Sequence, residues 1–420
     1  MTHMRNYKNQ YKKRLNLYSK ILLIIILCIF FFIHNNIFIN KNNVEKVNDD
    51  YIISWNTTIE KDRKEEFKDI KVFIDQVMNG TELYKNKIYN LSNNPKISIV
   101  ISVYNGEAYL KTILLSIQYQ DFKDIEIIMI DDCSKDNSVN LIKELMKTEP
   151  RIVLYQNKKN KGALYTKSTG VLLSRGKYVM TMDEDDIYVQ KDAFSTLYVE
   201  AEKNNLDILG FNFILFRSTI SRSLPNYSDK KRIIYQPELS NLMYNLTSNG
   251  KVRRFGGILW NLFIRNDIFK KVIKQIDEKN FNVRMNHHDD FILFFLLTRS
   301  AKSIKYIDRA FYAIYMDWKE DEKVKFRKKL KMENIINNKC FEYLNFLEIL
   351  FKNTKNTFED KKIAFSQLEE WYLNKFFCRN NKNTRERAIE VFKLYLNNEY
   401  VSKEDKKKLE EFINNEQNKI

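Results

Sequence analysis

Apolar runs alternate with amphipathic segments between residue 95 and about residue 190 of this chain. Four of the runs are rich in β-branched residues and are typical of strands buried on both faces. They cover residues 96–103, 125–130, 151–155 and 177–182. The segments between them have apolar residues at helical spacing, as at Leu110, Leu114 and Ile117. Strands that alternate with helices in this way predict an α/β fold with a mostly parallel, doubly wound sheet and flanking helices.

The pattern is looser after residue 217 and changes again at about residue 319. From there to residue 420 the chain is charged and is predicted to be helical. Apolar residues recur at helical spacing in two stripes, Phe365, Leu368, Tyr372 and Phe376, then Ile389, Phe392 and Leu396. We expect these stripes to pack on the preceding domain or on each other. The pattern therefore predicts an α/β domain over residues 95–318 and a C-terminal helical region over residues 319–420.

The N-terminal segment has thirteen consecutive apolar residues at 21–33 and extends, with a polar break, to residue 39. That length is about what is needed to span a bilayer. Residues 1–20 are basic and contain no acidic residue, whereas the charges after the segment are mixed. This asymmetry predicts a single-pass type II membrane protein with a cytoplasmic tail and its main domain on the other side of the membrane.

A cleaved signal peptide is the alternative, because thirteen residues also suit its apolar region. No small-x-small cleavage site follows, so an uncleaved transmembrane signal anchor over residues 21–39 is the preferred interpretation. Residues 40–94 are polar and are interpreted as a stem. In a eukaryotic cell this topology would place the main domain in the lumen of the ER or the Golgi.

The composition excludes some classes of function. Hydrophobic residues make up 44% of the chain, which argues against disorder throughout. The formal net charge is +17, but the lysines are spread along the whole chain, and no arginine-rich block is interleaved with aromatic residues. We therefore expect no nucleic-acid partner. The four cysteines show no zinc-binding spacing.

Three acidic clusters follow predicted strands or open a predicted helix. They are Asp131–Asp132, Asp183–Asp186 and Asp289–Asp290. Any one of them could be a solvated turn or a helix cap. Parallel sheets, however, bind ligands beyond the carboxyl ends of their strands, and acidic oxygen-rich sites suit Mg²⁺ or Mn²⁺. A metal clamp formed by Asp183 and Asp185 therefore explains the acidic run better than a surface turn does.

Two of the four histidines, His287 and His288, precede the third acidic cluster. A histidine beside an aspartate can ligate a metal, shuttle protons or belong to a polar loop, and the sequence leaves these alternatives open. His288 is the candidate metal ligand. No GxGxxG motif and no Walker A sequence is present, which argues against a dinucleotide site and a P-loop.

These motifs occur together in the stretch "ISIVISVYNGEAYL…SIQYQDFKDIEIIMIDDCSKDNS…NKGALYTKSTGVLLSRGKYVMTMDEDD". The stretch resembles the GT-A domain of family 2 glycosyltransferases. The resemblance is strong from residue 96 to about residue 217 and continues more loosely, through "GGILWNLFIRNDIF" and "HHDDFILFFLL", to about residue 316. It implies a GT-A fold and an enzyme that moves a sugar from a nucleotide-sugar, commonly a UDP-sugar, with inversion at the anomeric carbon. The acceptor would be a hydroxyl of a glycan, a lipid or a protein.

The resemblance also implies roles for individual residues. The nucleotide would be bordered by Val103, Tyr104, Asn105 and Glu107, and Asp131 or Asp132 would contact its base. Asp183 and Asp185 correspond to the DxD motif that carries Mn²⁺ or Mg²⁺ on the diphosphate. Asp290 would be the catalytic base, beside Asp289, and Gly257 and Trp260 would lie on the acceptor side, with Trp260 as a stacking platform for a sugar ring.

Two departures from the family pattern bear on these roles. Asp289 stands where the family commonly has Glu, so the choice between Asp289 and Asp290 as the base stays open. Glu184 stands between the two DxD aspartates, where a small residue is usual. The alternative function is a catalytically inactive membrane protein that keeps the fold and binds glycans or partners, since a fold does not fix an activity.

Overall fold

The computed structural model describes about two thirds of the 420-residue chain. The described residues are 70, 72, 74, 92–216, 220–223, 232–241, 244–246, 252–254, 258–286, 289–315, 332–353, 382–397 and 401–418. The predicted basic tail, the predicted anchor at 21–39 and most of the predicted stem therefore lie outside the described residues. Among the described residues, no helix combines the length and the apolar character needed to cross a membrane.

Four parallel strands form the first half of the main sheet, in the order β3-β2-β1-β4. Their bounds are β1 (Ile97–Val103), β2 (Ile125–Asp131), β3 (Ile152–Gln156) and β4 (Tyr178–Asp183). Every residue of β1 and β2 is buried, as continuous apolar runs predict for strands covered on both faces. The predicted parallel α/β sheet is therefore confirmed for this half, with strand ends within about one residue of the expected positions.

The second half of the sheet is mixed, with the order β4-β11-β6-β12-β5, and β7 and β8 at its margins. The bounds are β5 (Asp186–Tyr188), β6 (Ile208–Phe216), β7 (Ile220–Ser223), β8 (Ile234–Tyr235), β11 (Leu262–Arg265) and β12 (Ser303–Tyr315). Strand β11 is antiparallel to both β4 and β6, and β5 is antiparallel to β12. A separate antiparallel pair joins β9 (Tyr244–Leu246) to β10 (Val252–Arg254). The expectation of a mostly parallel sheet thus holds for the first half but not for the second.

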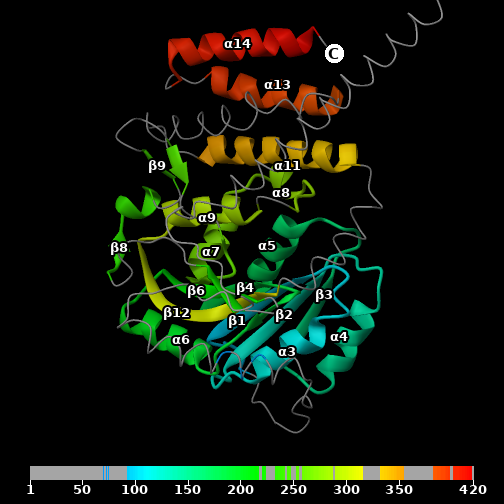
Figure 1. The fold of residues 1–420 in the computed structure, drawn as a ribbon, viewed down its shortest axis with the longest axis vertical. Helices are drawn as coiled ribbons and strands as arrows, with labels where there is room; N and C mark the ends of the chain where they lie inside the picture. The colour runs from blue at the N-terminus through cyan, green and yellow to red at the C-terminus, as the bar shows by residue number, and fades with distance from the viewer. Residues whose placement is uncertain are drawn as a thin grey trace, which may run out of the picture. The chain divides into compact units, whose positions relative to one another are not determined.

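Helices cover both faces of the main sheet (Figure 1). On one face lie α3 (Leu110–Gln118), α4 (Ser138–Met146) and α6 (Ala193–Lys203). The other face carries α5 (Ala163–Leu173), α7 (Asn266–Ile273) and α9 (Asp289–Ser300), together with the short α8 (Glu278–Phe281) and the 3₁₀ helix η1 (Glu238–Asn241). Each face has its own hydrophobic cluster of buried side chains, separated by the sheet. This arrangement leaves the carboxyl ends of β1, β2 and β4 at one edge of the sheet.

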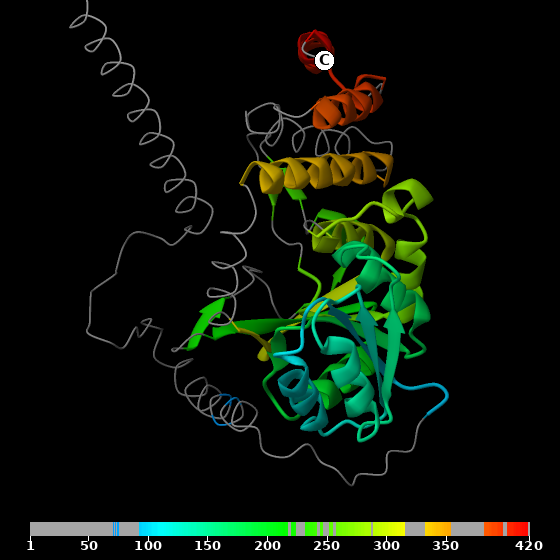
Figure 2. The same ribbon diagram turned by 90° about the vertical axis from the view of Figure 1, so that its right-hand side faces the viewer.

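The described parts of the C-terminal region are helical. They comprise α11 (Met332–Asn353), α13 (Lys382–Leu396) and α14 (Lys403–Gln417). Helix α11 contacts α9 and α13, and α13 contacts α14, so the three follow one another away from the sheet (Figure 2). One hydrophobic cluster continues from the sheet face through α9 into these helices. The expected packing of apolar stripes is seen for Ile389 and Phe392, whereas the stripe at residues 365–376 lies outside the described residues.

A few residues of the predicted stem are described. Ile70 and Ile74 are helical and buried in a small apolar cluster with Ile187, Val189 and Ala313. Full burial of an isoleucine side chain contributes about 1.5 to 3 kcal/mol. This part of the predicted stem therefore packs against the sheet near β5 and β12.

Candidate active site

The register of the parallel strands brings the first two acidic clusters together. Val103 pairs with Asp131 across β1 and β2, and Ser102 pairs with Asp183 across β1 and β4. The carboxyl ends of β2, β1 and β4 therefore lie next to one another at one edge of the sheet. This is the edge at which ligands bind in sheets of this kind.

The third acidic cluster reaches the same edge through a buried lysine. Lys167 Nζ lies 3.2 Å from Asp183 Oδ1, 3.0 Å from Asp289 Oδ2 and 3.0 Å from Asp290 Oδ1. Only 6% of the Lys167 side chain is exposed. We call Asp183, Asp289, Asp290 and Lys167 the acidic cluster of the site. It joins the end of β4 to the first turn of α9 through one ammonium group carried by α5.

Two glycines explain how Lys167 reaches this position. A Cβ at Gly170 would lie 2.3 Å from Val100 Cγ1, so the glycine lets α5 pack closely on β1. Gly162, before the first turn of α5, has a φ of 86°, and a Cβ there would lie 2.6 Å from backbone atoms of Met285. Leu164 N also donates a hydrogen bond to Met285 O. The segment before Asp289 is thereby held against the start of α5.

The charges of the acidic cluster shift two pKa values. Burial alone would lower the pKa of Lys167, but Asp183, Asp289 and Asp290 outweigh it and hold the pKa well above its ordinary value. Burial raises the pKa of Asp290 to about 7; Lys167 opposes the rise, and the carboxylates of Asp289 and Asp183 add to it. Lys167 is therefore a permanent ammonium at neutral pH, and Asp290 is a carboxyl that exchanges its proton near neutral pH.

The two aspartates of α9 differ in access to solvent. The Asp290 side chain is 20% exposed and the Asp289 side chain is 9% exposed. Asp289 Oδ2 is buried and, among the described residues, accepts no hydrogen bond, although it lies within ion-pair distance of Lys167. Both residues are in the first turn of the helix, where the helix dipole favours negative charge. Asp290 is therefore the more accessible of the two carboxyls.

The loops after β1 and β2 are joined by hydrogen bonds. Asn105, with a φ of 58°, accepts from Lys135 N at 2.7 Å, and its own N–H donates to Ser134 Oγ at 2.9 Å. Glu107 Oε2 accepts from Asn137 N at 3.1 Å. The side chains of Asn105 and Glu107, which are predicted to border the nucleotide, therefore connect the two loops. Tyr104, predicted to border the nucleotide as well, is 41% exposed.

Asp131 and Asp132 are both buried but have different partners. Asp132 accepts from Lys161 N and Gly162 N, each at 2.8 Å, so it satisfies N–H groups before the first turn of α5. Among the described residues, Asp131 accepts from Ser134 N, at the longer distance of 3.3 Å. Of the two, Asp131 is better placed to accept a further hydrogen bond from a base.

The acidic run at residues 183–186 forms a tight turn between β4 and β5. Glu184 and Asp185 occupy the turn, and Asp186 is buried and accepts from the Tyr312 hydroxyl at 3.0 Å. Asp183 N donates to the same hydroxyl at 3.3 Å. The turn is therefore fixed to β12, which directs Asp183 toward Lys167 and leaves Asp185 partly exposed.

Trp260 is placed differently from the sequence-based expectation. It is 8% exposed, stacks on Tyr312 with ring centroids 4.9 Å apart and meets Phe213 edge to face at 4.5 Å. These neighbours leave little ring surface for a sugar, so the structure favours a role in the aromatic core next to the site over a stacking platform. Gly257 and His288 lie outside the described residues.

The donor atoms of the site suit a hard divalent cation in chemistry, because they are carboxylate oxygens that converge on a cation. Asp289 Oδ2, however, lies 3.0 Å from the Lys167 ammonium. In the described part of the chain, no three His, Cys, Asp or Glu side chains are arranged as a ready metal site. The carboxylates are grouped around Lys167 instead.

Lys167 is the site residue that the sequence did not reveal. It is one of many lysines in a basic chain, and no local pattern marks it. The available signal was its position on the buried side of helix α5, which precedes the strand that ends at Asp183. A lysine predicted to be buried needs an anionic partner, and the acidic clusters supply it.

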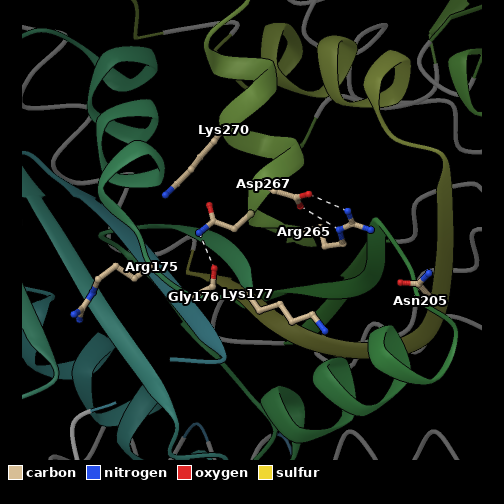
Figure 3. Close-up of a pocket in the computed structure, with 8 residues that line it drawn as sticks. Arg175, Gly176, Lys177, Asn205, Arg265, Asp267 and Lys270 are labelled. Carbon is tan, nitrogen blue, oxygen red and sulfur yellow. Dashed lines mark hydrogen bonds and ion pairs between the residues drawn. The ribbon is translucent and has the colours of Figure 1, made fainter. Parts of the chain in front are cut away.

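A pocket of about 570 Å³ lies at the opposite edge of the sheet, where β4 begins and β11 ends (Figure 3). It is lined by Arg175, Gly176, Lys177, Asn205, Arg265, Asn266, Asp267 and Lys270. Arg265 is paired with Asp207 and Asp267, and the Arg265–Asp267 pair is visible in the figure. None of the sequence-predicted site residues lines this pocket, so the acidic cluster and the pocket are separate features.

Comparison with known proteins agrees with this geometry. Residues 98–258 match the family model described as glycosyl transferase family 2. The chain is 29% identical over 219 residues to the uncharacterized glycosyltransferase EpsJ of Bacillus subtilis, which covers 52% of this chain and 60% of the relative. It is 34% identical over 117 residues to GalNAc(5)-diNAcBac-PP-undecaprenol beta-1,3-glucosyltransferase of Campylobacter jejuni, covering 28% of this chain and 38% of the relative. The chain thus spans less than two thirds of the length of these curated relatives.

The fold is similar to that of S. aureus TarS residues 1–349, solved in complex with UDP-GlcNAc. The TM-score is 0.52 at 16% sequence identity, over 74% of this chain and 82% of the TarS chain. The likeness supports the GT-A fold expected from the sequence. The family match runs from β1 to the residues before β11 and includes the strand ends that carry Asp131 and Asp183. The match to glycosyltransferase family 2 thus covers residues 98–258, and the comparisons together support a family 2 glycosyltransferase.

Proposed function

We propose that this chain is an inverting glycosyltransferase that moves a sugar from a nucleotide-sugar to a hydroxyl acceptor. The observation that carries the proposal is the meeting of Asp183, Asp289 and Asp290 at one buried point on the ligand-binding edge of the sheet. The match of residues 98–258 to the glycosyl transferase family 2 model supports the class of reaction. The likeness to a fold that binds UDP-GlcNAc in TarS supports a UDP-sugar as the donor.

In the proposed reaction, Asp290 accepts the proton of the acceptor hydroxyl as its oxygen bonds to the anomeric carbon. The bond from that carbon to the diphosphate breaks, and its electron pair leaves with the nucleotide. A pKa of about 7 suits Asp290 to this step, because it is ionised in a large fraction of molecules at neutral pH and is still basic enough to take a proton. Lys167, which is also paired with Asp289, donates a hydrogen bond to Asp290 and holds it in place.

We propose Mn²⁺ or Mg²⁺ as the cofactor, held by Asp183 and Asp185 with His288 as a further candidate ligand. When bound, such an ion would act as a Lewis acid that neutralises charge on the leaving diphosphate. The carboxylate oxygens at the edge of the sheet support this assignment. Asp131 would accept a hydrogen bond from the base of the nucleotide, and Tyr104 and Val103 would border it.

The acceptor is proposed to be a hydroxyl on a glycan, a lipid or a protein. The name of the Campylobacter relative includes an undecaprenol-linked glycan, which supports a lipid-linked glycan among these. We also propose that residues 21–39 anchor the enzyme, with the catalytic domain across the membrane from the basic tail. Protease treatment of sealed vesicles should leave the domain intact from the tail side, and cleavage from that side would contradict the topology.

The proposal is tested with the full chain in detergent and a panel of nucleotide-sugars, assayed for release of the nucleotide with Mn²⁺ and with EDTA. We expect metal-dependent release of UDP from one donor. The Asp290→Asn variant should release far less, and the Asp267→Asn variant, at the opposite edge of the sheet, should match the wild type. Absence of both release and nucleotide binding would contradict the proposal and favour a protein that only binds glycans or partners.

A further inference from the structure

One cation sits at the centre of the acidic cluster. The Lys167 ammonium is within 3.2 Å of an oxygen from each of Asp183, Asp289 and Asp290. It donates a hydrogen bond to Asp290 Oδ1 at 3.0 Å. The three carboxylates come from two segments more than 100 residues apart in the sequence, so the lysine is what joins them.

Asp183, one of these three carboxylates, is also a proposed ligand of the divalent cation. Carboxylates this close to one another repel, and the lysine is the positive charge that allows them to be grouped together. A metal ion bound to Asp183 would lie close to the ammonium, which is 3.2 Å from Asp183 Oδ1, and like charges repel.

A nucleoside diphosphate would change this balance. Its phosphate oxygens bring negative charge to the edge of the sheet and offer the ammonium another partner, while they also supply ligands to a divalent ion. The Lys167 ammonium has three donors on a long, flexible side chain, so it can exchange a carboxylate partner for a phosphate oxygen.

We infer that Lys167 is a positioning residue that holds the acidic cluster together without metal and keeps its affinity for free divalent cations low, so that the metal enters with the nucleoside diphosphate. The inference rests on the proposed function for the identity of the metal and the nucleotide. Lys167 would thereby prevent the metal from binding before the nucleotide, and it would also orient Asp290.

The test measures binding of Mn²⁺ to the full chain by electron paramagnetic resonance, without donor sugar or turnover. Lys167→Met should bind Mn²⁺ more tightly than the wild type when UDP is absent, by on the order of tenfold or more. Addition of UDP should tighten Mn²⁺ binding strongly in the wild type and only weakly in this variant. Lys167→Arg keeps the positive charge and should behave as the wild type does. A purely structural lysine predicts the opposite sign, because its loss would loosen the cluster and weaken Mn²⁺ binding.

Loss of the lysine alone leaves three carboxylates without their cation, which can unfold the protein. A second comparison avoids this problem, because it removes one carboxylate charge together with the lysine charge. Asp289→Asn is compared with Asp289→Asn combined with Lys167→Met, after circular dichroism has verified that both are folded. We expect the double variant to bind Mn²⁺ more tightly than Asp289→Asn alone. Equal or weaker binding overturns the inference.

The outcome is separable from that of the proposed function. Tighter Mn²⁺ binding in the Lys167→Met variant, combined with no nucleotide release by the wild type from any donor, would support the inference and contradict the enzymatic activity. Metal-dependent release by the wild type, combined with unchanged Mn²⁺ affinity in the variant, would overturn the inference alone.

Discussion

Replacement of Asp290 by Asn should remove the catalytic base and leave donor binding in place. A positioned general base contributes about 10²- to 10⁴-fold to a rate, which corresponds to roughly 3 to 5 kcal/mol of transition-state stabilisation. Asn keeps the size of the side chain, and its amide oxygen can accept the hydrogen bond that Lys167 Nζ donates to Asp290 Oδ1 at 3.0 Å. We therefore expect kcat to fall by about 10²-fold or more, with little change in KM for the donor.

The pH profile of the wild type should report the same carboxyl. Burial raises the pKa of Asp290 from 3.8 to about 7, and only the ionised form accepts a proton. The value of kcat/KM should therefore fall by about tenfold for each pH unit below about pH 7 and level off above it. Removal of Lys167, which lowers this pKa, should move the fall to higher pH.

Both expectations are measured by nucleotide release from the donor that the panel identifies, over a range of pH and at saturating metal. Asp267→Asn is the control, because Asp267 is an aspartate of α7 at the opposite edge of the sheet with a side chain that is 67% exposed. An Asp290→Asn variant as active as the wild type, or a wild-type profile that is flat through pH 7, would refute the assignment of the base.

Three further predictions concern packing, two of them beside the site and one in the C-terminal helices. Trp260→Ala should destabilise the fold by about 3 kcal/mol or more, seen in urea unfolding, whereas a sugar platform predicts a higher acceptor KM at unchanged stability. Gly162→Ala should lower both the melting temperature and kcat, because its Cβ would collide with the Met285 backbone; unchanged values of both would contradict the geometry. Arg387→Met should cost about 3 kcal/mol, because it leaves the buried Glu348 carboxylate without this partner, and wild-type stability of the variant would contradict that role.

The parts of the fold that sequence reasoning found are those set by local pattern. The four parallel strands are continuous apolar runs, and the edge that carries Asp131 and Asp183 follows from their common direction. The direction of β11 could not be found in this way, because a short apolar run has the same pattern in either orientation. The pattern therefore predicts the strand directions in the first half of the sheet and does not determine them in the second half.

The parts of the site that were missed depend on contacts between distant segments. Lys167 is buried only because α5 and α9 meet beside β4, and Trp260 is covered only because β12 brings Tyr312 against it. Asp132 has the same sequence context as Asp131, yet it binds N–H groups before α5 while its neighbour faces a loop. Side-chain partners of this kind are set by tertiary packing and have no local signal.

Calorimetric titration of the full chain with UDP in the presence of Mn²⁺ would show directly whether the nucleotide binds at the acidic cluster. We expect Asp183→Asn, at the carboxyl edge of the sheet, to weaken UDP binding by about tenfold or more, because it removes a proposed ligand of the metal on the diphosphate. We expect Asp267→Asn, in the pocket at the opposite edge, to leave the affinity unchanged. Equal UDP affinity of Asp183→Asn and the wild type, or loss of affinity only in Asp267→Asn, would contradict the placement of the nucleotide-sugar site at the acidic cluster.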